Sequence, residues 1–195
     1  MASNSPQRDF LLQQGFRYFN RGMVFLWRLG LGRLINIWPH GSGQIMVITH
    51  VGRRTGRRLR TPVNYAVLNG EIYCTAGFGQ ESDWYRNLRT HPEVEIWLPD
   101  SWYSGIAEDV TGCAGCTTIL RQVLIASGFA ARAAGIDPRL ISDEELERLT
   151  GPYRLIQIHR TSPLTGPGGP GDLSWVWPLA TAVLFLTRPT RRRRR

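Results

Sequence analysis

The sequence predicts a mainly β, α+β protein built around a small barrel of six or seven mostly antiparallel strands with flanking helices. Short apolar runs that are β-branched or alternate with polar residues recur between residues 44 and 162, as expected of strands with one buried face. Turn signals such as Asn69-Gly70 and Pro99-Asp100-Ser101 separate them and favour tight connections. The chain has 195 residues and is 42% hydrophobic, enough for one core domain of roughly 150 residues plus appendages.

Six segments are expected to form this barrel. Asn69-Gly70 joins two of them as a two-residue hairpin. Pro62 lies inside another, which indicates an edge position or a bulge because proline offers no N–H to a ladder. The predicted strands are residues 44–51, 59–68, 71–76, 94–98, 103–110 and 153–159.

Helices are predicted between and beside these strands. Ser82 or Asp83 can cap a short helix that ends near His91. Apolar residues recur at helical spacing through residues 113–134, which predicts one longer helix. Ser142 followed by Glu145 forms a capping box that starts another.

Residues 1–43 are expected to form an N-terminal amphipathic segment. Apolar residues recur in steps of three and four from Phe10 to Trp38, arginines share another face, and Gly30-Leu31-Gly32 suggests a break. The favoured interpretation packs the apolar face on the barrel. The alternative places the helix on an anionic bilayer, with Trp27 and Trp38 at headgroup depth.

The last 33 residues differ in composition from the rest. Residues 163–171 are a Pro/Gly linker, and residues 172–195 combine fifteen uncharged, mostly apolar residues (173–187) with an arginine cluster. Fifteen helical residues span about 22 Å, less than the roughly 30 Å of a hydrocarbon core. A shallow anchor on an anionic membrane is therefore expected, and an unstructured tail or an oligomer contact, such as a homodimer, is the alternative.

The net charge of +9 is concentrated in two regions. Lysine is absent, all 24 basic residues are arginine, and nine of them lie between Phe10 and Gly70 without any acidic residue. Within this region the loop 52–58 has two glycines and four arginines, the composition of a site that binds phosphate or carboxylate groups through backbone N–H groups and guanidinium forks. Nucleic acid is a weaker candidate, since the apolar tail favours membrane as the partner of the terminal arginines.

The order of several motifs resembles the deazaflavin-dependent nitroreductase family, whose members are split β-barrel proteins related to FMN-binding flavin reductases. The resemblance covers residues 44–109 and rests on the order of the motifs more than on any one of them. The motifs are Thr49-His50-Val51-Gly52-Arg53-Arg54-Thr55-Gly56, Arg60-Thr61-Pro62-Val63-Asn64-Tyr65, Ala76-Gly77-Phe78-Gly79, Trp84-Tyr85-Arg86-Asn87-Leu88 and Pro92-Glu93-Val94-Glu95.

This resemblance implies a split β-barrel that binds reduced coenzyme F420, with FMN as the alternative cofactor. The anionic tail of F420 is expected to bind to Arg53, Arg54, Thr55, Gly56 and Arg60. The ring is expected against the backbone of two segments, with a short helix closing the pocket. These positions are Pro62, Val63, Asn64, Ala76, Gly77, Phe78 and Gly79 for the ring, and Trp84 and Asn87 for the helix.

The implied reaction is hydride transfer from the reduced deazaflavin to an electron-poor, lipophilic acceptor such as a quinone or nitro compound. No side chain is assigned to catalysis. Similar quinone and nitro reductases carry tyrosines before the last strand, where this chain has Phe129 and then Tyr153, so these two are the expected substrate-side residues. A non-catalytic barrel that binds a flavin, deazaflavin or haem-like ligand remains the alternative.

The sequence also predicts where the protein resides. Its first residues lack the features of a secretion signal, and three cysteines fit a reduced intracellular protein. The expected location is cytoplasmic, peripheral on the inner membrane face. Cys113 and Cys116 have redox spacing, but they are interpreted as incidental small residues, and no metal site is expected.

Overall fold

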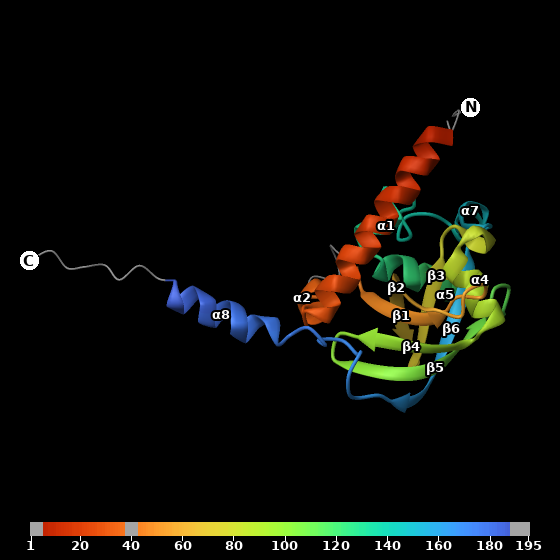
Figure 1. Cartoon of the computed structure of the whole chain (residues 1–195). Coiled ribbons are helices and arrows are strands. Elements are labelled where there is room, and N and C mark those ends of the chain that lie inside the picture. Colours follow the sequence, from red (N-terminus) through yellow and green to blue (C-terminus); the bar gives the residue numbers. More distant parts are fainter. Residues whose placement is uncertain (1–5, 38–42, 188–195) are drawn as a thin grey trace, which may run out of the picture.

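In the computed structural model, which describes residues 6–37 and 43–187, six antiparallel strands close into a barrel (Figure 1). The strands follow the order β1-β2-β3-β6-β5-β4 around it. Their bounds are β1 Ile45–Val51, β2 Arg58–Leu68, β3 Glu71–Ala76, β4 Glu93–Leu98, β5 Ser101–Asp109 and β6 Arg154–Pro163. All six predicted strands are therefore confirmed; the bounds of β3 match the prediction, and those of the other strands differ by at most four residues at an end.

The barrel interior holds the main core, which alternate residues of each strand supply. Met46, Ile48, Ile72, Ile96 and Ile158 are completely buried in it. Two helices cover the outside. Trp27 of α1 (Pro6–Arg28) packs on Val47 and Trp97, and α5 (Cys116–Ala126) packs on β2, β3 and β6.

The N-terminal helix buries only part of its apolar stripe. Met23 and Trp27 pack on the barrel, whereas Phe19 and Leu26 stay exposed. The predicted break is present: α1 ends at Arg28, Gly30 adopts a φ of +82°, and the short α2 (Gly32–Ile35) follows. The interfacial role predicted for Trp38 lies outside the described residues, as do the structures of residues 1–5, 38–42 and 188–195.

The remaining helices are short and lie between strands. After the 3-10 turn η1 (Gly79–Glu81) comes α4 (Asp83–Thr90), with Ser82 at its N-cap. The capping box of α7 (Asp143–Thr150) is confirmed, since Glu145 N donates to Ser142 Oγ at 3.2 Å. The predicted helix 113–134 is instead divided into α5 and α6 (Phe129–Ala133) because Gly128, at φ +60°, redirects the chain.

Cys113 and Cys116 form a disulfide, so interpreting them as incidental small residues was wrong. Gly112 and Gly115 both adopt positive φ angles on either side of Cys113, and the tight loop that they allow brings the two sulfurs together. Cys113 lies on the exposed side of this loop, and Cys116 begins α5. The spacing alone does not predict the disulfide, because cysteines separated by two residues occur unpaired, bound to a metal or joined in a disulfide.

The C-terminal segment leaves the barrel along its own path. Residues 164–174 run back over the barrel and contact the end of α1, and α8 (Val176–Leu186) then projects away from the rest of the molecule (Figure 1). No helix within the described ranges 6–37 and 43–187 has the length and apolar character needed to cross a membrane.

Candidate functional site

The strands β2 and β3 separate partway along the barrel, and this gap defines the candidate site. Residues 58–64 of β2 pair with β1, but β2 pairs with β3 only from Tyr65 onward. Tyr65 N donates to Gln44 O on the β1 side at 3.1 Å. The backbone N–H and C=O groups of successive residues point to opposite sides of a strand. Because Tyr65 points toward β1, the backbone groups of Asn64 and Pro62 point toward the open side. Pro62 thus lies at an open edge, as predicted.

The other wall of this gap is the turn that follows β3. Ala76 ends the strand with its side chain in the core, and Gly77, Phe78 and Gly79 turn the chain toward η1. Gly79 adopts a φ of +52°, and a Cβ there would collide with the carbonyl of Pro152. A Cβ on Gly77 would lie 3.6 Å from the Tyr153 ring. The turn is therefore fixed against the start of β6.

Three side chains beside the gap are engaged elsewhere, which leaves their backbone groups next to it. Val63 and Ala76 are buried in the barrel core. Asn64 Nδ2 donates to Gln44 O at 3.2 Å, and Trp84 of α4 packs partly buried against the same core. The family resemblance places a flat ring against the main chain at these positions, and that placement stays a prediction.

Tyr153 lies beside the Gly77 turn and packs against the small apolar cluster formed by α5, α6 and α7. Burial raises the pKa of its hydroxyl, so the phenol stays protonated at neutral pH and can donate a hydrogen bond. Phe129 is the first residue of α6. Its side chain lies outside what the structure describes, and its substrate-side role stays a prediction.

The basic loop 52–58 differs from the predicted backbone cradle, because its own chain uses most of its N–H groups. Thr55 N and Gly56 N donate to Gly52 O at 3.1 and 2.8 Å, and Gly52 N donates to Arg57 O at 2.8 Å. The N–H of Arg53 donates to Asn87 Oδ1 at 3.1 Å. Anion binding here would therefore depend on guanidinium groups rather than on the main chain.

Arg53 is bound to α4 through both of its terminal guanidinium nitrogens. Its Nη1 donates to Asn87 Oδ1 at 3.0 Å and its Nη2 donates to Asp83 Oδ1 at 2.9 Å. The neighbouring Arg54 and Arg57 are exposed, and their guanidiniums have no hydrogen bond or ion pair within the described part of the chain. Arg54 and Arg57 are thus the loop cations available to a ligand, whereas Arg53 holds the loop to the helix.

A buried polar network explains this attachment. Asn87 is 3% exposed and lies between Arg53 and His50, which is 2% exposed. Because Arg53 offers only donors, Asn87 Oδ1 must face it, and Asn87 Nδ2 then donates to His50 Nδ1 at 3.3 Å. His50 Nε2–H can then donate to Thr61 Oγ1 at 3.1 Å. Burial lowers the pKa of His50 to about 4, which keeps the ring neutral.

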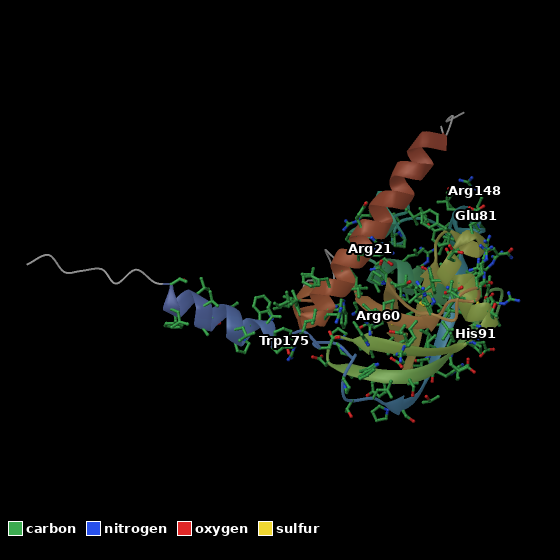
Figure 2. The ribbon with its side chains drawn as sticks, viewed as in Figure 1. Arg21, Arg60, Glu81, His91, Arg148 and Trp175 are labelled. Atoms are coloured by element: carbon green, nitrogen blue, oxygen red, sulfur yellow. A yellow bond between two sulfur atoms is a disulfide. The ribbon has the colours of Figure 1, made fainter. Side chains whose placement is uncertain are left out.

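Arg60 is separate from the loop arginines. Its guanidinium lies 4.6 Å from the centre of the Trp97 ring, and Nη2 donates to Gly168 O at 2.8 Å. Burial, then the nearby charge of Arg28, lowers the pKa of Arg60. A groove of about 300 Å³ lies between α1 and β2, and Figure 2 labels Arg21 and Arg60 there. Its lining is Asn20, Arg21, Val24, Phe25, Arg28 and Arg60.

The predicted residues are thus brought together in two places. The ring positions line the gap between β2 and the Gly77 turn, and the loop arginines lie near α4, but Arg60 faces α1. A larger cavity, of about 360 Å³, lies between α2, the β4–β5 turn and the C-terminal linker and includes none of the predicted residues. The sequence places Arg57 in the basic loop but not among the individual cofactor positions, and its exposure in the structure adds it to them as a candidate.

Several solved structures are similar to this chain. A conserved hypothetical protein from Mycobacterium tuberculosis is 21% identical, over 63% of this chain and 76% of that one, with a TM-score of 0.46. The F420-H2 dependent reductase FDR-A is 18% identical, over 60% and 93%, at 0.43. The haem storage protein HutZ from Vibrio cholerae is 14% identical, over 66% and 89%, at 0.41.

No curated protein matches the sequence. The family model described as F420H(2)-dependent quinone reductase matches residues 27–142, more than half of the chain. That range includes β1 to β5 and every predicted cofactor position. The chain therefore belongs to the F420H2-dependent quinone reductase family and is an oxidoreductase whose cofactor is coenzyme F420.

Proposed function

We propose that this protein reduces a lipophilic quinone with F420H2 bound in the gap between β2 and the Gly77 turn. One observation carries the proposal: the open edge of β2 at Pro62 and Asn64 faces a turn that Gly79 fixes against Pro152. A flat ring in this gap would contact main-chain groups on both sides. The bound cofactor supplies a hydride, which with one proton from solvent converts the quinone to its hydroquinone.

The anionic tail of the cofactor would lie on the guanidiniums that have no internal partner. Arg54 and Arg57 meet this condition in the described structure, and forked guanidinium groups suit phosphate and carboxylate oxygens. Arg53 would act indirectly, since it fixes the loop to α4 through Asp83 and Asn87. Arg60 is a second candidate contact on the α1 side of β2.

The acceptor would bind beyond the Gly77 turn. Phe78 is 65% exposed there and offers an apolar surface, and the half-buried Tyr153 lies against Gly77. The Tyr153 hydroxyl, which burial keeps protonated by raising its pKa, can donate a hydrogen bond to a quinone oxygen. This contact would favour negative charge on that oxygen as the hydride arrives.

A titration followed by turnover tests the proposal. F420 added to the purified protein should bind saturably, FMN should compete weakly or not at all, and reduced F420 should be oxidised when a naphthoquinone is supplied. A nitroaromatic compound supplied in its place tests the other acceptor class. Saturable binding without turnover of either acceptor would instead support a carrier, and absence of F420 binding would exclude the proposal.

A further inference from the structure

The C-terminal helix α8 is almost entirely apolar, and the described part of the chain, residues 6–37 and 43–187, does not cover it. None of its eleven residues is buried. Leu179, Val183, Leu184 and Leu186 are 56% to 86% exposed. A helix that is hydrophobic all round is normally found inside a protein core or in a membrane, so its surroundings in the working protein must be apolar.

The polar side chains of α8 and of its C-cap residue Thr187 already have hydrogen-bond partners. The hydroxyl of Thr181 donates to Trp177 O at 2.9 Å, and that of Thr187 donates to Val183 O at 2.9 Å. The indole N–H of Trp177 donates to Leu29 O at 2.9 Å, and Pro178 lies in the first turn, where a helix needs no N–H donor. The side chains of the helix can therefore enter an apolar medium without losing a hydrogen bond.

The base of α8 is fixed to the end of α1. Gly171 N donates to Trp27 O at 3.0 Å, and Leu173 N donates to Arg28 O at 2.8 Å. Arg28 also forms a forked ion pair with Asp172, at 2.9 Å. Figure 2 labels Trp175 at the start of the projecting helix. The helix thus leaves the barrel in a direction that folded contacts determine.

We propose that α8 is an in-plane anchor that lies in one leaflet of an anionic bilayer. Eleven helical residues are about 16 Å long, roughly half of a hydrocarbon core. Residues that prefer headgroup depth are present at both ends: Trp175 and Trp177 at the start, and Arg188 and residues 191–195 just after the end in the sequence. With both ends held at headgroup depth, the helix lies parallel to the membrane.

A second copy of the chain is a poorer partner for this helix. Parallel pairing of two copies of α8 would bring together two clusters of six arginines, and antiparallel pairing would give them no acidic partner, since no acidic residue follows Asp172. An anionic leaflet instead attracts each arginine near its surface with about 1 kcal/mol. The exposed Leu34 and Ile37, which lie just beyond the same end of α1, add apolar surface near this base.

The anchor would also orient the barrel. Gly168 accepts a hydrogen bond from Arg60, so the segment that carries α8 contacts the groove between α1 and β2. If the proposed function holds, the barrel is kept at the surface of the phase in which lipophilic quinones dissolve. Membrane binding itself does not depend on that function.

Cosedimentation of the full-length protein with vesicles tests the anchor. Vesicles of equal parts phosphatidylglycerol and phosphatidylcholine should retain the protein more strongly than phosphatidylcholine alone. The double variant Leu184→Gln/Leu186→Gln should partition at least about tenfold less, because each substitution removes the favourable transfer of a leucine side chain into the bilayer. The matched control Val67→Gln/Leu140→Gln changes two exposed apolar residues elsewhere and should bind like wild type.

Vesicles with brominated acyl chains give a second measurement. They should quench part of the tryptophan fluorescence, and Trp175→Phe/Trp177→Phe should remove that part. Wild-type partitioning by the Leu184→Gln/Leu186→Gln variant would overturn the proposal. The proposal would also be overturned if the wild-type protein formed a dimer that did not bind vesicles and if the Leu184→Gln/Leu186→Gln substitutions dissociated that dimer. Neither measurement uses F420, so failure of the proposed reaction would not affect them.

Discussion

Arg53 and Arg54 are neighbours in the chain but have different surroundings. Arg53 is bound to Asp83 and Asn87, whereas Arg54 and Arg57 are exposed and have no partner in the described structure. The sequence predicts the whole loop as a ligand site because four arginines occur without nearby acids. It does not identify which arginine is internally paired, since Asp83 lies 30 residues away and becomes a neighbour only when α4 closes the barrel end.

This difference leads to the first prediction. Arg54→Ala and Arg57→Ala should each weaken F420 binding by about tenfold or more, since a charged hydrogen bond contributes about 1.5–3 kcal/mol, and should leave the melting temperature unchanged. Arg53→Ala should lower the melting temperature as well. Fluorescence titration and thermal unfolding measure the two effects, with the exposed Arg139→Ala as control. Wild-type affinity in both loop variants would refute the assignment.

The second prediction concerns His50. Its folded pKa of about 4 lies below the ordinary value of 6.5, so the unfolded chain binds the proton more readily. The stability that the neutral ring contributes is therefore complete above pH 6.5 and is lost as the pH falls from 6.5 toward 4. Between pH 7 and pH 5 the free energy of unfolding should drop by about 2 kcal/mol from this group.

Urea unfolding at several pH values measures this slope. His50→Gln should flatten it, because glutamine does not titrate, whereas His91→Gln should keep it. An unchanged slope in His50→Gln would show that other groups dominate acid unfolding. Protonation of His50 would also disturb the buried Asn87 and, through it, Arg53, so loss of the α4 contact at low pH should also weaken cofactor binding.

At the scale of elements, the strands were the most predictable feature. Alternation places Met46 and Ile48 inside and Val47 outside, and Asn69-Gly70 forms the expected hairpin between β2 and β3. The division between α5 and α6 was not predicted, because apolar residues at helical spacing before Gly128 and alanines after it continue the helical pattern. The backbone at Gly128 nevertheless leaves the helical conformation, with a φ of +60°, and this ends the helical run.

The third prediction uses two glycines of the site. Gly79 and Gly56 both have positive φ, but a Cβ on Gly79 would collide with Pro152 O, whereas one on Gly56 has no atom within 4 Å. Gly56→Ala should therefore destabilise the protein by about 1 kcal/mol, the strain of the left-handed conformation. Gly79→Ala should cost more and should displace the turn from Tyr153. Thermal unfolding and F420 titration compare them, and equal effects would contradict the described contact.

At the scale of the whole molecule, the linker has a larger role than its composition predicts. Glycine and proline cannot build a core, which favours a loose connection. Here, however, their small size allows close contact: a Cβ on Gly169 would lie 2.5 Å from the Trp102 ring, and Leu164 N donates to Trp102 O at 2.7 Å. Arg28 and Asp172, separated by 144 residues, complete the attachment.

Two truncations separate the linker from the helix, which is the fourth prediction. Ending the chain after Trp177 removes most of α8 but keeps every described bond of residues 164–174, so the melting temperature and F420 affinity should stay close to wild type. Ending it after Pro163 removes Asp172 and Gly168, which leaves Arg28 and Arg60 without these partners and uncovers Trp102. A loss of a few kcal/mol in unfolding free energy is expected, together with weaker cofactor binding if Arg60 contacts the anionic tail of the cofactor.

The variant Asp172→Asn, which breaks only the ion pair, should have a stability between those of the two truncated proteins. If both truncations unfold alike, the linker is not part of the folded barrel.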